Sequence, residues 1–191
     1  MTPTSSSASG RSGARDIAVW DPLVRIIHWS LALTIALNAT LIDDDSALHQ
    51  WIGYVAVLLV SLRLVWALIG PRSARFSAFP PNPAKALRYL RGVRAGDRTI
   101  YLSHNPLGGL MVYNLWLTVI ALGVTGYMMT TLRYFGIDWV EEAHELAFSW
   151  LMVSVALHVA GVAAVSRRSG VNLVRAMVNG RKEIREESKV A

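Results

Sequence analysis

The chain has no cysteine among its 191 residues. Thiolates hold iron–sulfur clusters, pair as disulfides and tether c-type haem, so these three arrangements are excluded. A haem could be held only without a covalent link, by residues such as histidine or methionine. Methionines in apolar segments more often fill gaps in the core, which is how we interpret those of this chain. They are Met111, Met128, Met129 and Met152.

Charged residues are scarce in four long segments of the chain, in which apolar residues dominate. Each segment is long enough to cross a hydrocarbon core of about 30 Å as a helix, and too little polar face remains for a water-exposed helix. The sequence therefore predicts an all-α membrane protein, a four-helix transmembrane bundle in one domain over residues 18–183. The four segments are Leu23–Ile42, Ala47–Gly70, Gly108–Thr131 and Ala143–Val165.

The net charge of +6 is distributed unevenly along the chain. Basic residues gather in the first tail, in the loop after the second segment and in the last tail, whereas the other two loops are acidic apart from Arg133. This is the positive-inside pattern, so we expect both termini in the cytoplasm and contact with membrane lipid rather than nucleic acid. The acidic residues are Asp43, Asp44, Asp45, Asp138, Glu141 and Glu142.

The segments outside the four spans divide into tails and short helices. Residues 1–17 read as a disordered cytoplasmic tail and residues 184–191 as a flexible one, because they offer little apolar surface to bury. Two amphipathic stretches are expected to form short interfacial helices on the cytoplasmic side. Asp or Asn followed by proline is typical of a helix start, and it occurs three times. The interfacial stretches are Pro83–Arg91 and Val171–Val178, and the caps are Asp21, Asn82 and Asn105.

Four of the five histidines lie inside the apolar segments or at their edges. An ionisable side chain in lipid is costly, which makes it a candidate for function. His144 and His158 are 14 residues apart, so they share a helix face with about 40° between them and a separation of roughly 21 Å along the axis. His28 matches His158 in depth, and His49 matches His144. This pattern predicts two haem groups, with His28 and His158 as axial ligands of the inner iron and His49 and His144 of the outer.

Histidine and arginine near the ends of membrane spans can also have purely structural roles. A histidine at a helix end, such as His49 or His144, is often only interfacial. His104 lies in a basic loop with no histidine left to pair with, and we interpret it as structural or as a contact to a haem propionate. Arg63 lies at the inner depth, where it could snorkel to headgroups or pair with a haem propionate; we favour the propionate.

Several segments together resemble the bacterial cytochrome b561 superfamily, most closely its branch of b-type cytochrome subunits of nickel–iron hydrogenases. The likeness covers about residues 18–183. The segments are VWDPLVRIIHW at 19–29, LHQWIGY at 48–54, LRLVW at 62–66, SHNPLGG at 103–109, HEL at 144–146 and NLVRAMVNGRK at 172–182.

The resemblance implies a four-helix bundle in the bacterial inner membrane with two non-covalent haem b groups. It also implies electron transfer between the quinone pool and a periplasmic redox protein or enzyme subunit, with His28, His49, His144 and His158 as ligands. The outer loops are short, so the surface for docking a large periplasmic enzyme is small, and a stand-alone cytochrome, or one that serves a small soluble redox protein, fits as well as a subunit of a hydrogenase complex. Alternatives are a quinone oxidoreductase acting on a small reductant such as superoxide, and a transporter or metal-binding subunit lined by histidines. The sequence leaves open whether the chain forms a homodimer.

Overall fold

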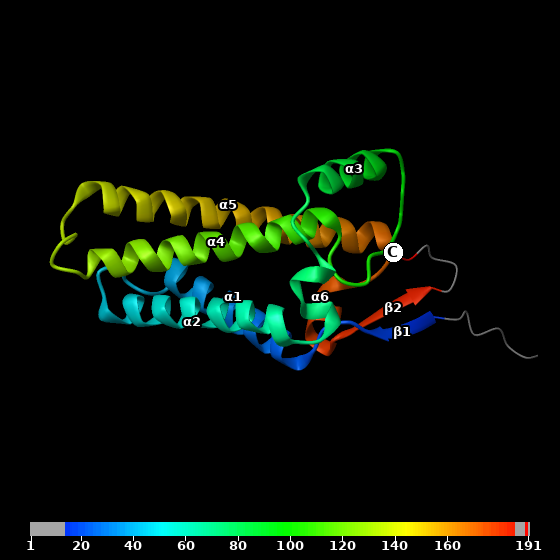
Figure 1. Cartoon of the computed structure of the whole chain (residues 1–191), viewed down its shortest axis with the longest axis horizontal. Coiled ribbons are helices and arrows are strands. Elements are labelled where there is room, and N and C mark those ends of the chain that lie inside the picture. The colour runs from blue at the N-terminus through cyan, green and yellow to red at the C-terminus, as the bar shows by residue number, and fades with distance from the viewer. Residues whose placement is uncertain (1–13, 186–189, 191) are drawn as a thin grey trace, which may run out of the picture.

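The computed structural model describes residues 14–185 and 190. Its main body is a bundle of four long helices, arranged as two antiparallel hairpins (Figure 1). All four are long and apolar enough to cross a membrane, which confirms the predicted fold class. The helices are α1 (Pro22–Thr40), α2 (Ala47–Ile69), α4 (Pro106–Met129) and α5 (Asp138–Ser169).

Side-chain caps set where the spans begin. Asp21 accepts a hydrogen bond from the Val24 amide at 3.1 Å, and Asn105 accepts one from the Gly108 amide at 2.7 Å. In both helices a proline follows at the first helical position, where its missing N–H costs nothing. The predicted caps at Asp21 and Asn105 are therefore confirmed.

Helix α5 is longer than the predicted span Ala143–Val165, with 32 residues from Asp138 to Ser169. The extra turns carry acidic residues at the first end and Arg167 and Arg168 at the last. Charges in this order interact favourably with the helix dipole, so the helix continues into the polar region on both sides.

Two shorter helices lie at the end of the bundle where the termini are. Helix α3 (Pro83–Arg94) packs against α4, and α6 (Leu173–Asn179) follows α5. Helix α3 runs three residues beyond the prediction. Helix α6 starts two residues later than predicted, because the side chain of Asn172 caps it by accepting from the Arg175 amide at 2.8 Å. Two 3₁₀ turns, η1 (Arg72–Ala74) and η2 (Phe76–Ala78), lead from α2 towards α3.

A small antiparallel ribbon, which was not predicted from the sequence, joins the two ends of the described chain. It pairs β1 (Ala14–Ala18) with β2 (Arg181–Arg185), so residues 14–17 and 184–185 are strands and not parts of tails. The two strands are far apart in the sequence, so no local pattern predicts that they pair. The burial of Ile184 likewise depends on distant residues, because Ile184 packs against Ile100 and Val171. The rest of both predicted tails lies outside the described residues.

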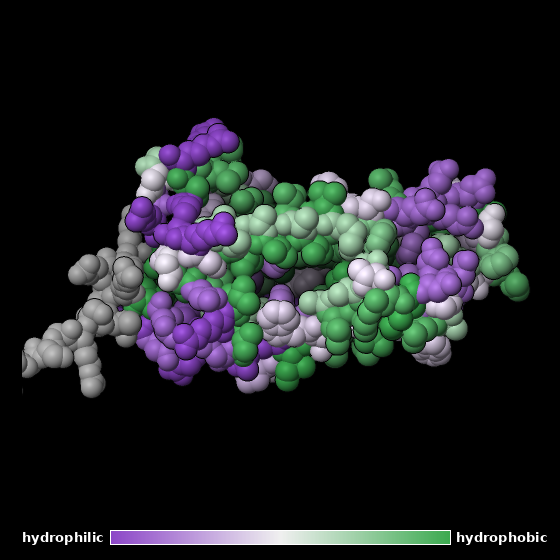
Figure 2. Space-filling view, turned by 180° about the vertical axis from the view of Figure 1, so that it is seen from behind, coloured by the Kyte–Doolittle hydropathy of each residue, from purple (hydrophilic) through white to green (hydrophobic). Residues whose placement is uncertain are grey.

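The hairpins meet mainly through α2 and α4, around a core of Ala56, Val60, Phe79, Trp116, Val119 and Leu151. Helices α1 and α5, in contrast, make only marginal contact. Figure 2 shows apolar residues covering the middle of the molecule, polar residues at its two ends, and a recess in the apolar belt. The outer surface therefore suits lipid, and the bundle is open along one seam.

Candidate functional site

The inner pair of predicted ligands comes from the first and last spans. His28 of α1 and His158 of α5 are both half-buried, with ring centroids 6.4 Å apart and ring planes at 51°. The indole of Trp29 meets the His28 ring edge-on at 5.2 Å. The Nδ1 atom of His28 is buried and has no hydrogen-bond partner among the described residues. The structure thus brings the predicted inner pair together across the seam.

The outer pair repeats this arrangement at the other end of the bundle. His49 of α2 and His144 of α5 have ring centroids 6.4 Å apart and ring planes at 63°. His144 Nδ1 lies 2.9 Å from the hydroxyl oxygen of Thr125 on α4, and a Cβ at Gly126 would lie 3.3 Å from the His144 ring. Gly126 therefore makes room for this imidazole, and Thr125 orients it. His49 Nδ1 has no partner in the part of the chain that the structure describes.

Arg63 points into the bundle and not towards headgroups. Only 5% of the residue is exposed, and its Nη2 donates to the Ala74 carbonyl oxygen at 3.1 Å. Its Cζ lies 5.1 Å from the centre of the Trp116 ring, at a distance typical of a cation–π contact. The other nitrogen, Nη1, is buried without a hydrogen-bond partner among the described residues. This geometry disfavours snorkelling and leaves one donor free for an anion.

Residues 19–180 match the family of prokaryotic cytochrome b561. The chain belongs to this family. It is therefore a bacterial membrane protein, a b-type cytochrome that binds haem b and takes part in electron transfer. The match agrees with the resemblance drawn from the sequence. No curated protein and no solved structure matches the chain.

The histidine pairs of this cytochrome fit a haem iron held between two imidazoles. Two metal–nitrogen bonds of about 2 Å, and roughly 1 Å from each nitrogen to its ring centre, give a centroid separation of about 6 Å. Both observed separations are 6.4 Å, too long for a direct hydrogen bond between the rings. The marginal contact of α1 with α5 leaves room between the hairpins, and Arg63 offers a donor suited to a propionate. The residues present therefore fit the cofactor of the family.

His104 belongs to neither pair, although it lies close to the inner one. Its ring lies between Trp20 and Phe79, with centroid distances of 4.8 and 4.6 Å, and its Nδ1 is 3.3 Å from the Ser103 hydroxyl. Burial, and next the charge of Lys182, lower the pKa of His104 to about 3, and the charges of His158 and His28 contribute slightly to this shift. His104 is therefore neutral near pH 7 and packs as an aromatic residue, and no second imidazole faces it among the described residues.

Lys182 is a buried cation that sequence reasoning missed. Its ammonium group donates to the carbonyl oxygens of Tyr101, Leu102 and Ser103 at 2.9, 2.8 and 3.2 Å, and it lies 5.7 Å from the Trp20 ring centre. Burial lowers the pKa of Lys182 to about 8. Lys182 therefore fixes the loop that carries His104. This role of Lys182 could have been predicted only if strand β2, which contains it, had been predicted first.

A polar network inside the bundle was also missed. Asn114 of α4 donates from Nδ2 to the Ser154 hydroxyl at 2.8 Å and accepts at Oδ1 from the Trp150 indole at 2.9 Å. Such bonds join helices in lipid, where an unsatisfied amide is costly. Gly123 also brings two helices together, because α4 and α2 approach closely there and a Cβ would lie 2.1 Å from a methyl carbon of Val57. A single asparagine in an apolar segment was the only signal in the sequence.

Proposed function

We propose that this cytochrome holds two haem b groups and carries electrons across the bacterial inner membrane, between the quinone pool and a periplasmic redox partner. His28 and His158 are the axial ligands of the inner haem, and His49 and His144 those of the outer haem. The observation that carries the proposal is the equal spacing of these two pairs, 6.4 Å in both.

Helix α5 supplies one imidazole to each site. His144 and His158 lie 14 residues apart on it, which corresponds to roughly 21 Å along the helix axis. The width of two macrocycles reduces the gap that an electron must cross. A single rigid helix therefore fixes the distance between the two sites.

Each site has its own supporting residues. The Thr125 hydroxyl bonds His144 Nδ1, which leaves Nε2 as the nitrogen available to a metal. Arg63 holds a positive charge at the inner site and offers its free Nη1 to a carboxylate. Haem b would supply a one-electron couple at each site, and an iron held by two imidazoles would have no position left for oxygen.

The basic loop and tail lie at the end where the termini meet, and we assign this end to the cytoplasm. The loops at the opposite end span only residues 41–46 and 130–137. A surface this small favours a small soluble redox protein as the periplasmic partner. Superoxide is a weaker candidate, because the one cation of these loops, Arg133, lies over the Tyr134 ring at 5.4 Å.

The test is haem stoichiometry. Purified protein, expressed with an adequate haem supply, is assayed by pyridine haemochrome against protein concentration from amino-acid analysis. We expect two haems per chain, both extractable by acid acetone because no cysteine tethers them. One haem per chain, or none, would contradict the proposal, and full occupancy with no quinol oxidation in proteoliposomes would contradict the quinone part alone.

A further inference from the structure

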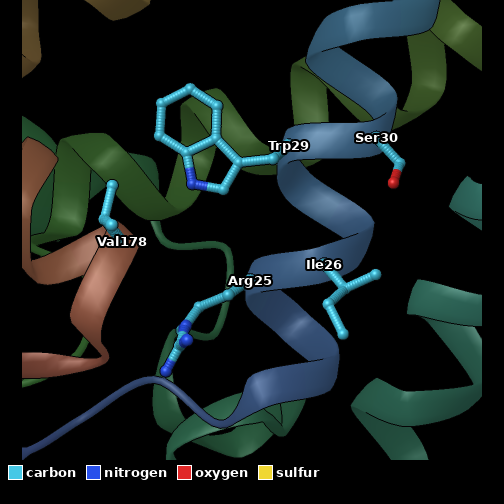
Figure 3. A pocket seen from close by; sticks show the side chains of 5 residues that line it. All are labelled: Arg25, Ile26, Trp29, Ser30 and Val178. Carbon is cyan, nitrogen blue, oxygen red and sulfur yellow. The ribbon is translucent and has the colours of Figure 1, made fainter.

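A groove of about 590 Å³ lies on the outer face of α1, close to its first turn (Figure 3). Arg25, Ile26, Trp29 and Ser30 line it from α1, and Val178 lines it from α6. In Figure 3 the side chains of Trp29 and Val178 approach each other between the two helices, with Arg25 one turn nearer the start of α1. The Trp29 indole donates to the Met177 carbonyl oxygen at 3.3 Å, which holds α6 beside α1.

Arg25 is the polar residue that sets this groove apart. It is half-buried, its Nε is buried without a partner, and its guanidinium makes no hydrogen bond or ion pair among residues 14–185 and 190. Two other arginines, both in residues 172–185, are paired with acidic side chains: Arg175 with Glu183 at 3.3 Å, and Arg181 with Asp16 at 2.5 Å. An unpaired guanidinium in a largely apolar groove has donors available for an anion from outside the described chain.

The groove also has the right depth for a lipid headgroup. Arg25 is the fourth residue of α1, about 5 Å along the axis from the helix start. Trp29 follows one turn deeper, as is common for tryptophan at a membrane interface. Ile26 and Val178, which are 62% and 58% exposed, provide apolar surface next to Arg25. A phosphate at Arg25 would thus place an acyl chain along Ile26 and Val178.

The local charge favours an anionic lipid over a zwitterionic one. Among the described residues, Arg25 is the one charged residue that lines the groove, and no acidic residue lines it. A headgroup with its own cation would bring that cation close to Arg25, whereas a phosphate without one would meet only the guanidinium.

We propose that this groove binds the phosphate of one anionic phospholipid from the leaflet on the side of the chain termini. The Arg25 guanidinium recognises the phosphate, and Ile26, Trp29 and Val178 contact the first carbons of an acyl chain. The groove is lined by none of the four paired histidines, although its Trp29 meets the His28 ring edge-on at 5.2 Å.

Native mass spectrometry of the delipidated holoprotein tests the proposal with phosphatidylglycerol and phosphatidylcholine of identical acyl chains. The wild type should retain one phosphatidylglycerol in preference to phosphatidylcholine. Arg25→Gln should lower this preference roughly fivefold, the factor expected for one basic residue near an anionic surface. Arg133→Gln, at an exposed arginine in the loop at the opposite end of the bundle, is the matched control and should bind as the wild type does.

A second variant does not depend on the folding of Arg25→Gln. Val178→Glu places a carboxylate in the groove at an exposed position and should abolish the preference, whereas Val178→Gln should keep it. The proposal is overturned if Val178→Glu binds phosphatidylglycerol as the wild type does. It is also overturned if a short-chain ubiquinone or inorganic phosphate displaces the bound lipid at an equal concentration.

Discussion

His28 and His158 belong to the first and the last membrane-spanning helix, and their imidazole centroids lie 6.4 Å apart. Little else joins these two helices, since α1 and α5 make only marginal contact. A group bound between the two rings would therefore link the hairpins where direct packing does not. Occupancy of the inner site and closure of the bundle are thus expected to depend on each other.

The pairing predicts which substitutions act together. His28→Ala and His158→Ala should each remove the inner haem, and His49→Ala and His144→Ala should each remove the outer one. The measurement is a redox titration combined with low-temperature electron paramagnetic resonance, in which each haem gives its own low-spin signal. Loss of the same signal in His28→Ala and His49→Ala would show that the assignment of the pairs is wrong.

Arg63 should tune the potential of the inner haem. Arg63→Leu removes a buried cation that stabilises the reduced form, so the inner potential should fall by roughly 60 mV, or about 1.4 kcal/mol for one electron. The iron should stay low-spin, because both imidazoles remain. Arg88→Leu on the surface of α3 is the control. An inner potential equal to that of the wild type would exclude the propionate role.

Thr125 should stabilise the outer haem through His144. Thr125→Val keeps the shape of the side chain but removes the oxygen that lies 2.9 Å from His144 Nδ1. Loss of such a supporting bond typically weakens metal binding by about 10- to 100-fold. Haem retention during dialysis against apomyoglobin measures the effect. Thr130→Val is the control, because among the described residues that hydroxyl bonds the Tyr127 carbonyl oxygen and no histidine. Equal retention in the two variants would contradict the prediction.

His104 should make the fold sensitive to acid. Its pKa is lowered to about 3 in the folded chain, against 6.5 for an ordinary histidine. Between these values the unfolded chain binds more protons, so the contribution of His104 is complete above pH 6.5 and is lost as the pH falls towards 3. His104→Phe preserves the ring between Trp20 and Phe79 and should flatten this part of the profile.

Circular dichroism melting between pH 4 and 8 tests the acid sensitivity. The four paired histidines are the same in the wild type and in His104→Phe, so acid release of haem affects both proteins and cancels in the comparison. Parallel melting profiles of the two proteins over this range would rule out His104 as the source of acid sensitivity.

The sequence predicted those features that depend on local patterns. The four spans follow from runs of apolar residues, and the starts of α1 and α4 follow from Asp21 and Asn105 before proline. The histidine pairs could be predicted because helices convert sequence spacing into depth. That the four imidazoles bind haem iron stays a prediction.

The features that were missed depend on contacts between distant segments. Thr125 is one hydroxyl among several in its span, and only the packing of α4 on α5 singles it out. Lys182 reads as one more basic residue of the tail until strand β2 places it beneath residues 101–103. Such roles have no local signature, because the partners are about 20 to 80 residues away.

The ribbon that pairs Ala14 with Arg185 has a consequence for biosynthesis. Strand β1 is made before the first span, but its partner leaves the ribosome only after all four spans have been translated. The ribbon and the Lys182 contacts must therefore form after the last span has been translated. A chain truncated before residue 181 keeps the four long helices but lacks strand β2 and the Lys182 contacts to residues 101–103. The loop of residues 101–103 is therefore held in place only once residues 181–185 have been translated.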